Sequence, residues 1–296
     1  KWESEWVDAQ GPYSPELIQY IVEHKNDYSI FVFVTYLYYH TVKGLPMVAD
    51  RAILIPTAHD ESYIYFDIYK QIFQMPRALI YLTAEEKKFV ESQFAVEEKP
   101  NCICGGGVDV PQQIDNAAYR EKYSLYDDYL IYVGRIDPCK GCDEMFEIFK
   151  MYKAEHPEDS LKLVLMGKAL MEIPHDSDII YQGFVSEEDK FNGISGARVL
   201  WLPSQYESLS LAVLEAMALG VPVIVNGNSD VLKGHCERSR AGKYYYDTLK
   251  AIQILDFFAQ KQNRQCMSEN AIRYVKENYQ WELVVKKIRD LFAMLK

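Results

Sequence analysis

The stretch VLWLPSQYESLSLAVLEAMALGVPVIV, residues 199–225, decides the fold of this chain. VLWL is a short apolar run typical of a buried strand, and the Pro-Ser pair that follows ends it. LAVLEAMALG (211–220) has the apolar spacing of a helix, with Gly220 suited to its C-terminal cap. Pro222 then opens another apolar run. A strand, a helix and a strand in this order predict a parallel β/α unit.

Two carboxylates, Glu207 and Glu215, flank the start of this helix. Glu207 belongs to the loop at the carboxyl end of the strand, where parallel α/β sheets bind ligands. The helix start near Ser210 and Leu211 offers free backbone N–H groups, which suit an anion. An anion site beside carboxylates fits a ligand that carries both phosphates and hydroxyls. A nucleotide-sugar is such a ligand.

The composition of the chain excludes several classes of protein. Its 296 residues, 49% of them hydrophobic, suffice for two α/β domains of ordinary size. A net charge of −11 provides no basic face, so we expect no nucleic-acid partner. The longest apolar run is shorter than the ~20 residues that span a bilayer. Six cysteines without a regular framework favour a reducing compartment, and we expect a cytoplasmic protein.

Strand-like and helical segments alternate along the chain, which predicts parallel, doubly wound sheets. The expected strands are 28–36, 51–56, 77–83, 100–104, 129–133, 161–166, 179–182, 199–202 and 221–225. The polar stretch 111–128 breaks the alternation and is the best candidate for a linker. The fold class is therefore α/β, with two Rossmann-like domains and a cleft between them.

A second motif, YVGRIDPCKG (132–141), follows a predicted strand and precedes a predicted helix. Gly134 would let the backbone approach a ligand closely. Arg135 offers a planar fork of donors and Lys140 a mobile point charge, and together they suit a departing diphosphate. Taken alone, the pair fits a solvated basic loop better than a ligand site. Its place in the same predicted domain as the two carboxylates favours the diphosphate interpretation.

This motif, followed by YQGFVSEEDKFNGISGARVLWLPSQYESLSLAVLEAMALGVPVIV, resembles the donor half of a family 4 glycosyltransferase with the GT-B fold. The similarity spans roughly residues 129–225, with the motifs in the family's order and spacing. Weaker similarity covers GGGVDV (105–110), IPTAHDE (55–61) and the final WELVVKKIRDLFAML (281–295).

The resemblance implies an acceptor-side domain at 1–118, a donor domain at 119–280 and a terminal helix at 281–296 that crosses back to the first domain. Family members usually begin with further β/α units, so we expect the first domain to be incomplete. The family usually has glycine where this chain has Ser210.

The resemblance also implies a role for each matching residue. Arg135 and Lys140 would bind the donor diphosphate close to Gly134, and backbone N–H groups near Ser210 and Leu211 would meet its distal phosphate. Such enzymes retain the anomeric configuration and generally need no metal and no cofactor, because the cationic pair and the helix dipole replace the cation.

The remaining implied roles concern the sugar and the nucleoside. Glu207 would approach the transferred sugar and Glu215 the ribose hydroxyls, while residues around Gly183-Phe184-Val185 would border the base. His59 would face the sugar and the acceptor from the other domain. The implied catalytic residues are Glu207, His59, Arg135 and Lys140. By itself, His59 is more consistent with a structural histidine than with a catalytic one. Its place at the carboxyl end of a strand, beside Asp60 and Glu61, makes the two interpretations about equally consistent.

The implied function is transfer of a hexose-type sugar from a UDP- or GDP-linked donor to a saccharide or lipid-linked acceptor. Two alternatives stay open. One is a non-catalytic nucleotide-sugar-binding module, or a half-enzyme, whose acceptor half is lost or supplied by a partner chain. The other is a nucleotide-sugar epimerase. Peripheral association with the inner membrane face is a further possibility for a lipid-linked acceptor.

Two motifs carry little weight. Cys139-Lys-Gly-Cys142 flanks the proposed phosphate lysine and, with Cys102 and Cys104, lacks the spacing of a structural zinc site. Asp176-Ser-Asp178 precedes a strand in a polar loop instead of ending one, so a solvated turn is expected. No metal site is predicted.

Overall fold

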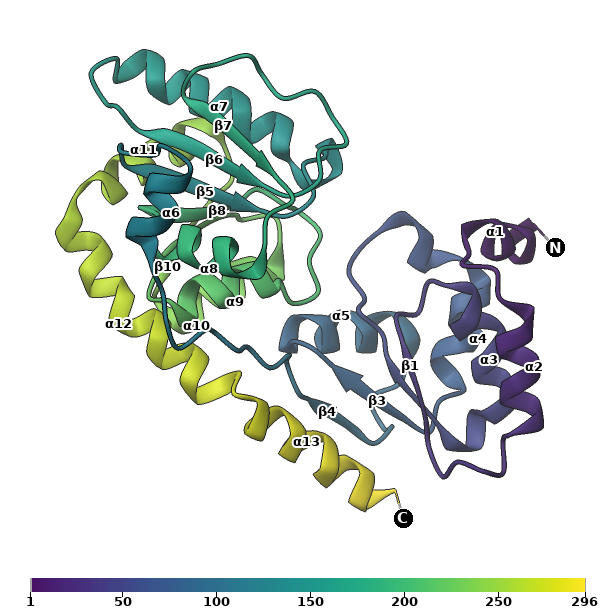
Figure 1. The fold of residues 1–296 in the computed structure, drawn as a ribbon. Coiled ribbons are helices and arrows are strands. Elements are labelled where there is room, and N and C mark those ends of the chain that lie inside the picture. The colour runs from purple at the N-terminus through teal and green to yellow at the C-terminus, as the bar shows by residue number, and fades with distance from the viewer. Residues whose placement is uncertain (1, 296) are drawn as a thin grey trace. The chain divides into compact units, whose positions relative to one another are not determined.

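The computed structural model describes residues 2–295, which pack as two units. Unit 1 joins the residues up to Gly106 with those from Glu282 onward, and unit 2 is Gly107–Trp281. Each unit contains one sheet of parallel strands with helices packed against it (Figure 1). The predicted α/β class with two parallel sheets is confirmed.

Unit 1 is built on four parallel strands in the order β1-β2-β3-β4. The strands are β1 (Phe31–Val34), β2 (Ala52–Ile55), β3 (Ala78–Tyr81) and β4 (Asn101–Ile103). Its α-helices are α1 (Trp2–Gln10), α2 (Pro15–Glu23), α3 (Tyr39–Gly44), α4 (Asp67–Gln74), α5 (Ala84–Phe94) and α13 (Trp281–Met294), with 3-10 turns η1 (Leu45–Arg51) and η2 (Ser62–Tyr65). The sequence did not predict α1, α3 and α4, because these short helices show too few turns for a clear apolar period.

Each face of this sheet carries its own core. One face packs against the helices between α1 and α5, with Phe33, Leu54 and Tyr81 buried among them. The other face packs against α13, whose Val284 and Leu291 lie in one apolar cluster with sheet residues. The last helix of the chain thus belongs to the core of unit 1.

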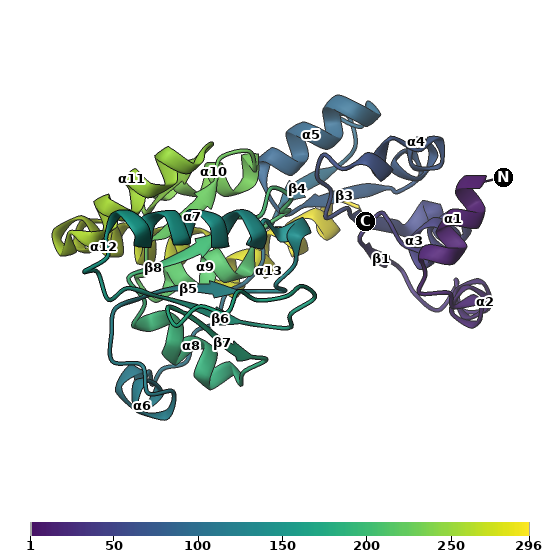
Figure 2. The same ribbon diagram turned by 90° about the horizontal axis from the view of Figure 1, so that it is seen from above.

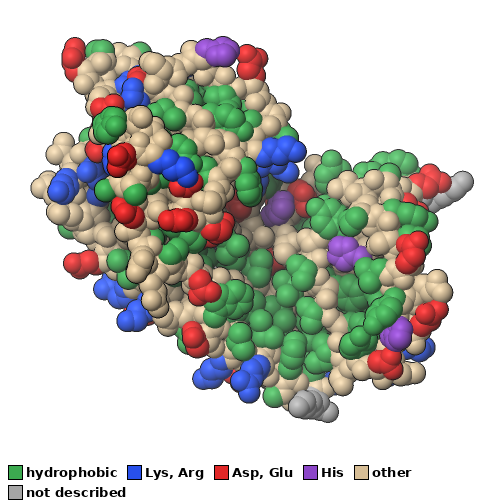
Figure 3. Space-filling model, in the orientation of Figure 1, with side chains coloured by type: hydrophobic (Ala, Val, Ile, Leu, Met, Phe, Trp, Pro, Cys, Tyr) green, Lys and Arg blue, Asp and Glu red, His purple; other side chains and the backbone are tan. Residues whose placement is uncertain are grey.

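Strand β1 lies at the edge of its sheet, although its FVFV sequence is typical of a strand buried on both faces. Val32 and Val34 are 45% and 53% exposed. Figure 3 shows hydrophobic side chains gathered over the strands of unit 1. The described residues therefore leave two apolar side chains of β1 partly exposed to solvent.

Unit 2 is built on six parallel strands in the order β10-β9-β8-β5-β6-β7. The strands are β5 (Tyr129–Val133), β6 (Lys162–Met166), β7 (Ile179–Gly183), β8 (Val199–Leu202), β9 (Val223–Asn226) and β10 (Gly242–Tyr245). The helices are α6 (Asn116–Lys122), α7 (Cys142–Glu155), α8 (Glu187–Ser195), α9 (Leu211–Ala218), α10 (Asp230–Ser239), α11 (Thr248–Ala259) and α12 (Lys261–Asn278), with η3 (Pro138–Lys140). The predicted strands 129–133 and 199–202 are confirmed, with the same bounds in the structure. Strand β10 and helix α10 were not predicted.

The strand order of unit 2 is that of a doubly wound, Rossmann-type sheet. All strands are parallel, and the order in which they are added to the sheet reverses between β5 and β8. Because right-handed crossovers in opposite directions place helices on opposite faces, α7 and α8 lie on different sides of β5 and β6 (Figure 2). Ligands bind outside the carboxyl ends of the strands at such a reversal. The fold therefore draws attention to the loops that follow β5 and β8.

The structure moves the domain boundary relative to the prediction. The sequence placed it after residue 118, within a linker at 111–128, but residues from Gly107 onward pack with unit 2. The Val108 N–H donates to the Tyr279 carbonyl at 2.9 Å. The Asp115 N–H donates to Asn192 Oδ1 at 2.8 Å, and α6 follows directly. The segment packs through hydrogen bonds, which polar residues make. Its polar composition is therefore the same as that of a solvated linker, and composition alone could not distinguish the two.

None of the helices within residues 2–295 is both long and apolar enough to cross a membrane.

Candidate active site

The loop after β5 brings backbone and charge to the point where the strand order reverses. Gly134 has φ 153°, a conformation that favours glycine, and its N–H donates to the Met166 carbonyl at 2.9 Å. The buried Tyr132 hydroxyl donates to the Arg135 carbonyl at 2.6 Å. Arg135 Nε lies 3.2 Å from Asp137 Oδ2, and the arginine side chain is 54% exposed. The loop is thus fixed at its backbone while the guanidinium faces solvent.

Lys140 and Glu207 form an ion pair that joins the ends of β5 and β8. Lys140 Nζ lies 2.7 Å from Glu207 Oε1, with both side chains largely buried. Gly141 directly follows the lysine with φ 73°, and a Cβ there would lie 2.7 Å from the Pro203 carbonyl oxygen. Only glycine lets the loop after β5 approach the loop after β8 this closely. Two residues that the sequence singled out separately therefore meet.

Helix α9 begins beside this pair. Ser210 precedes it with φ 66° and ψ 86°, a left-handed conformation that costs a non-glycine residue about 1–2 kcal/mol. This geometry explains why glycine suits the position. The helix start offers the N–H groups of its first turn to an anion. Glu215 lies about one turn into the helix, closer to its start than the sequence suggested.

Glu215 is paired with a lysine that the sequence did not single out. Lys190 Nζ, on α8, lies 2.9 Å from Glu215 Oε1 and 2.8 Å from the exposed Glu187. Burial raises the pKa of Glu215, although the contact with Lys190 opposes that shift. Burial alone would lower the pKa of Lys190, but its bonds to Glu187 and Glu215 outweigh burial and raise it. We conclude that the lysine is charged and holds the Glu215 carboxylate in place.

The loop after β7 carries the residues expected to border a base. Gly183 has φ 72°, which turns the chain at the strand end. Phe184 is 92% exposed, so its ring is open to stacking. Val185 then leads into α8, which bears Lys190. The loops after β5, β7 and β8 all leave the same carboxyl edge of the parallel sheet of unit 2.

His59 lies in unit 1, in the loop that follows β2. Its Nε2 is 3.5 Å from Glu61 Oε2, and the Tyr36 hydroxyl donates to Glu61 Oε1 at 2.6 Å. Glu86, at the start of α5, accepts from the Ala58 N–H at 2.7 Å and from the Leu82 N–H at 2.6 Å. The segment around His59 is therefore held by two carboxylates from different parts of unit 1.

Glu86 should make the stability of the protein depend on pH. It is 2% exposed, and burial raises its pKa from 4.5 to about 7 despite its backbone hydrogen bonds. A carboxyl whose pKa is raised on folding stabilises the native state when protonated and loses that contribution as pH rises from about 4.5 to about 7. We expect this residue to lower the free energy of unfolding by about 3 kcal/mol between pH 5 and pH 8.

Urea denaturation of the wild type and of Glu86→Gln at several pH values checks this. The difference between the two should change with pH, and Glu85→Gln, one residue away in the same helical turn, should follow the wild type. Parallel stability curves for wild type and Glu86→Gln would contradict the assignment.

The motifs set aside on sequence grounds have other roles. Asp178 is held by Lys153 at 2.9 Å and by Lys162 at 2.5 Å, so it serves an ion-pair cluster before β7. All six cysteines are free thiols, among them buried Cys142 and exposed Cys139. Within residues 2–295, no group of three or more His, Cys, Asp or Glu side chains is arranged to hold a metal.

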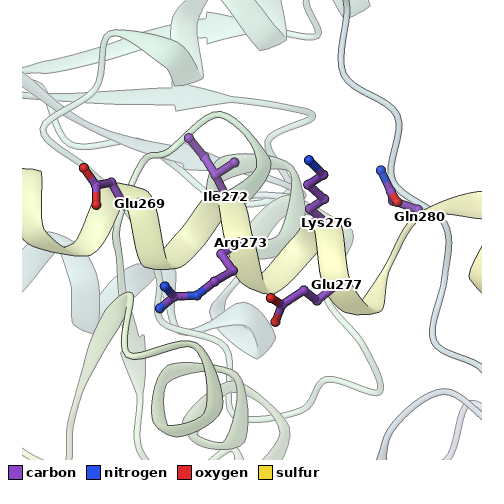
Figure 4. A pocket seen from close by; sticks show the side chains of 6 residues that line it. All are labelled: Glu269, Ile272, Arg273, Lys276, Glu277 and Gln280. Carbon is purple, nitrogen blue, oxygen red and sulfur yellow. The ribbon is translucent and has the colours of Figure 1, made fainter.

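A separate hollow of about 590 Å³ lies along α12. Figure 4 shows the side chains that line it, all from α12 or the turn after it: Glu269, Ile272, Arg273, Lys276, Glu277 and Gln280. Two acidic and two basic side chains share this helix face, which is the usual pattern of a solvated helix. The hollow is apart from the residues discussed above.

The strand order of unit 2 is that of a doubly wound α/β protein, and its charged side chains Lys140, Glu207 and Glu215 lie where such proteins bind ligands. Residues 127–244 match the family model described as Glycosyl transferases group 1. The matched region contains the loops that bear Arg135, Lys140, Glu207 and Glu215. This domain match supports a glycosyltransferase.

Similar proteins agree with the match. An uncharacterized glycosyltransferase of Methanocaldococcus jannaschii is 25% identical over 191 residues, which is 60% of this chain and 48% of that protein. The chain spans less than half the length of the curated relatives that it matches.

Two solved structures show the fold. Sucrose-phosphate synthase from Thermosynechococcus elongatus superimposes with a TM-score of 0.76 at 18% identity, covering 96% of this chain and 81% of that one. The Anabaena HepE protein, solved with UDP and glucose, superimposes with a TM-score of 0.76 at 12% identity, covering 97% and 83%. The chain thus resembles GT-B glycosyltransferases in fold.

The sequence did not single out Lys190, Tyr36 and Glu86, and it indicated Glu61 only as a neighbour of His59. Only Glu86 had a local signal: Thr83-Ala-Glu-Glu86 has the pattern of a capping box, and the Glu86 N–H donates to Thr83 Oγ1 at 3.1 Å. Lys190 and Tyr36 contact residues 25 positions away in sequence, Glu215 and Glu61 respectively. Spacing along the chain could not reveal them.

Proposed function

We propose that this chain transfers a hexose-type sugar from a nucleoside diphosphate donor to a saccharide or lipid-linked acceptor, with retention of configuration and without a metal ion. The observation that carries the proposal is the Lys140–Glu207 pair beside the start of α9, at the reversal of the sheet of unit 2. The match to the group 1 glycosyltransferase model supports it.

In the proposed reaction, the bond between the anomeric carbon and the diphosphate oxygen breaks, and the diphosphate keeps the electron pair. Lys140, Arg135 and the N–H groups at the start of α9 stabilise the negative charge that develops there. An acceptor hydroxyl then forms the new C–O bond on the face that the diphosphate left. Its proton passes to the departing diphosphate.

The carboxylates hold the donor in place. Glu207 accepts from sugar hydroxyls and, through its ion pair, keeps Lys140 directed at the diphosphate. Glu215 accepts from the ribose hydroxyls, and Lys190 orients it. Phe184 stacks on the base. His59, in unit 1, contacts the sugar or the acceptor.

The donor is UDP- or GDP-linked in this proposal, and the presence of UDP in the HepE structure favours UDP. Six free thiols support a location in the reducing cytoplasm. The proposal includes a partner chain that covers the exposed Val32 and Val34 of β1. It also includes peripheral contact with a membrane that carries the acceptor.

The test is to incubate the purified chain with UDP- and GDP-hexoses and a panel of saccharide and lipid-linked acceptors, in the presence of EDTA. Formation of a glycosylated acceptor, with nucleoside diphosphate released in equal amount, is expected. Binding without any turnover would favour a non-catalytic module instead. Release of nucleotide with an epimerised free sugar, independent of acceptor, would favour an epimerase.

A further inference from the structure

We propose that Glu61, braced by Tyr36, is a positioning residue for His59: its carboxylate fixes the Nε2 side of the imidazole and so sets which face and which nitrogen the ring offers to substrate. The catalytic consequence rests on the role of His59 in the proposed function. The positioning itself is a property of unit 1 alone.

The two oxygens of Glu61 have different partners. Oε2 lies 3.5 Å from His59 Nε2, and Oε1 accepts the Tyr36 hydroxyl at 2.6 Å. Burial by itself would raise the pKa of Glu61, but the bonds from His59 and Tyr36 outweigh it and lower that pKa. The group is therefore a carboxylate at neutral pH. A carboxylate beside Nε2 favours the tautomer that carries its proton on Nε2.

The brace is rigid because Tyr36 is fixed in the core. Its side chain is 1% exposed and meets the Tyr69 ring edge-on, with centroids 4.8 Å apart. The Tyr69 hydroxyl in turn donates to the Leu37 carbonyl at 2.9 Å, and the Tyr36 N–H donates to the Pro56 carbonyl at 3.0 Å. The phenol that holds Glu61 thus belongs to the framework of β1 and β2.

The backbone before His59 is held just as firmly. Thr57 has φ 53° and Thr35 has φ 71°, a conformation that is rare for β-branched residues, and their hydroxyls are hydrogen-bonded to each other. Ala58, the next residue, donates its N–H to the buried Glu86. Strained backbone persists where its surroundings enforce it, and it gathers at functional sites. Side chain and backbone of this segment are thus both fixed.

The chain offers a matched control in the next residue. Asp60 stands between His59 and Glu61 and accepts a tyrosine hydroxyl, that of Tyr65, at 2.5 Å. This second carboxylate–tyrosine pair is exposed. Asp60→Asn therefore makes the same chemical change in the same loop without touching the proposed brace.

The first test is nitrogen-15 NMR of the His59 ring, which requires no substrate. In the wild type and in Asp60→Asn, the neutral ring should carry its proton on Nε2. In Glu61→Gln the amide can donate to Nε2, so the Nδ1-protonated tautomer should appear. A His59 spectrum unchanged by Glu61→Gln would overturn the positioning role.

The second test is a double-mutant cycle on turnover. Glu61→Gln should lower kcat at least 10-fold with little change in the KM for donor, whereas Asp60→Asn should stay within 2-fold of the wild type. In a His59→Ala background, Glu61→Gln should cause no further loss, because it acts through His59. A further loss would mean that Glu61 acts directly, against the proposal. If no donor is turned over at all, the proposed function fails while the NMR result still decides the positioning.

Discussion

Replacing Lys140 by alanine should lower donor turnover about 100-fold or more. The ammonium is the proposed partner of the departing diphosphate, whose charge grows in the transition state. Its removal should also leave Glu207, now 2.7 Å from Nζ, as an uncompensated carboxylate beside the diphosphate. Because that charge is larger in the transition state than in the bound donor, kcat should fall more than donor affinity.

Steady-state kinetics on the variant check this expectation, with Lys150→Ala as the control. Lys150 pairs with Glu147 at 3.2 Å on the surface of α7, so its loss should leave turnover unchanged. Wild-type turnover in Lys140→Ala would remove the lysine from the mechanism. A loss matched by Lys150→Ala would indicate a general effect on folding.

Replacing Glu215 by glutamine should weaken binding of the donor and of the free nucleoside diphosphate by about 10- to 100-fold. The carboxylate is the proposed acceptor of two ribose hydroxyls, and hydrogen bonds to a charged group are worth about 1.5–3 kcal/mol. The substitution also removes one partner of Lys190, which is itself largely buried. The turnover number of the bound donor should change less, because the ribose is far from the bond that breaks.

Glu187→Gln is the matched control for this variant. Glu187 lies 2.8 Å from the same Lys190, but its side chain is 79% exposed and it stands outside the proposed ribose site. Calorimetric affinities should therefore rank wild type and Glu187→Gln together, with Glu215→Gln well below them. Equal affinities for all three would refute the ribose assignment.

Those parts of the fold that depend on local pattern could be predicted from the sequence. The buried strands β5 and β8 are continuous apolar runs. Helix α5 has the bounds predicted from the sequence AEEKKFVESQF, which follows the N-cap Thr83. The order of these units along the chain was enough to predict parallel sheets. Local pattern failed for β10, whose GKYY sequence is only partly buried, and for the segment before α6, whose polar residues bond to α8.

Within the candidate site, the sequence predicted which loops matter but not which side chains pair. Glycines and charges at strand ends pointed to Arg135, Lys140 and Glu207, because parallel strands bring their carboxyl ends to one edge. The pairing of Glu215 with Lys190 depends on the packing of α8 against α9. The Tyr36–Glu61–His59 contact likewise depends on β1 lying beside β2. Such partners are set by tertiary structure, and spacing along the chain does not encode them.

The most direct measurement is calorimetric titration of the purified chain with UDP, GDP and ADP in the presence of EDTA. The account predicts binding of one of these nucleotides with a Kd on the order of micromolar, about −8 kcal/mol, and loss of that binding in Glu215→Gln. Binding of none, by a chain shown to be folded, would contradict the central claim that Arg135, Lys140, the start of α9 and Glu215 form a nucleotide-sugar site.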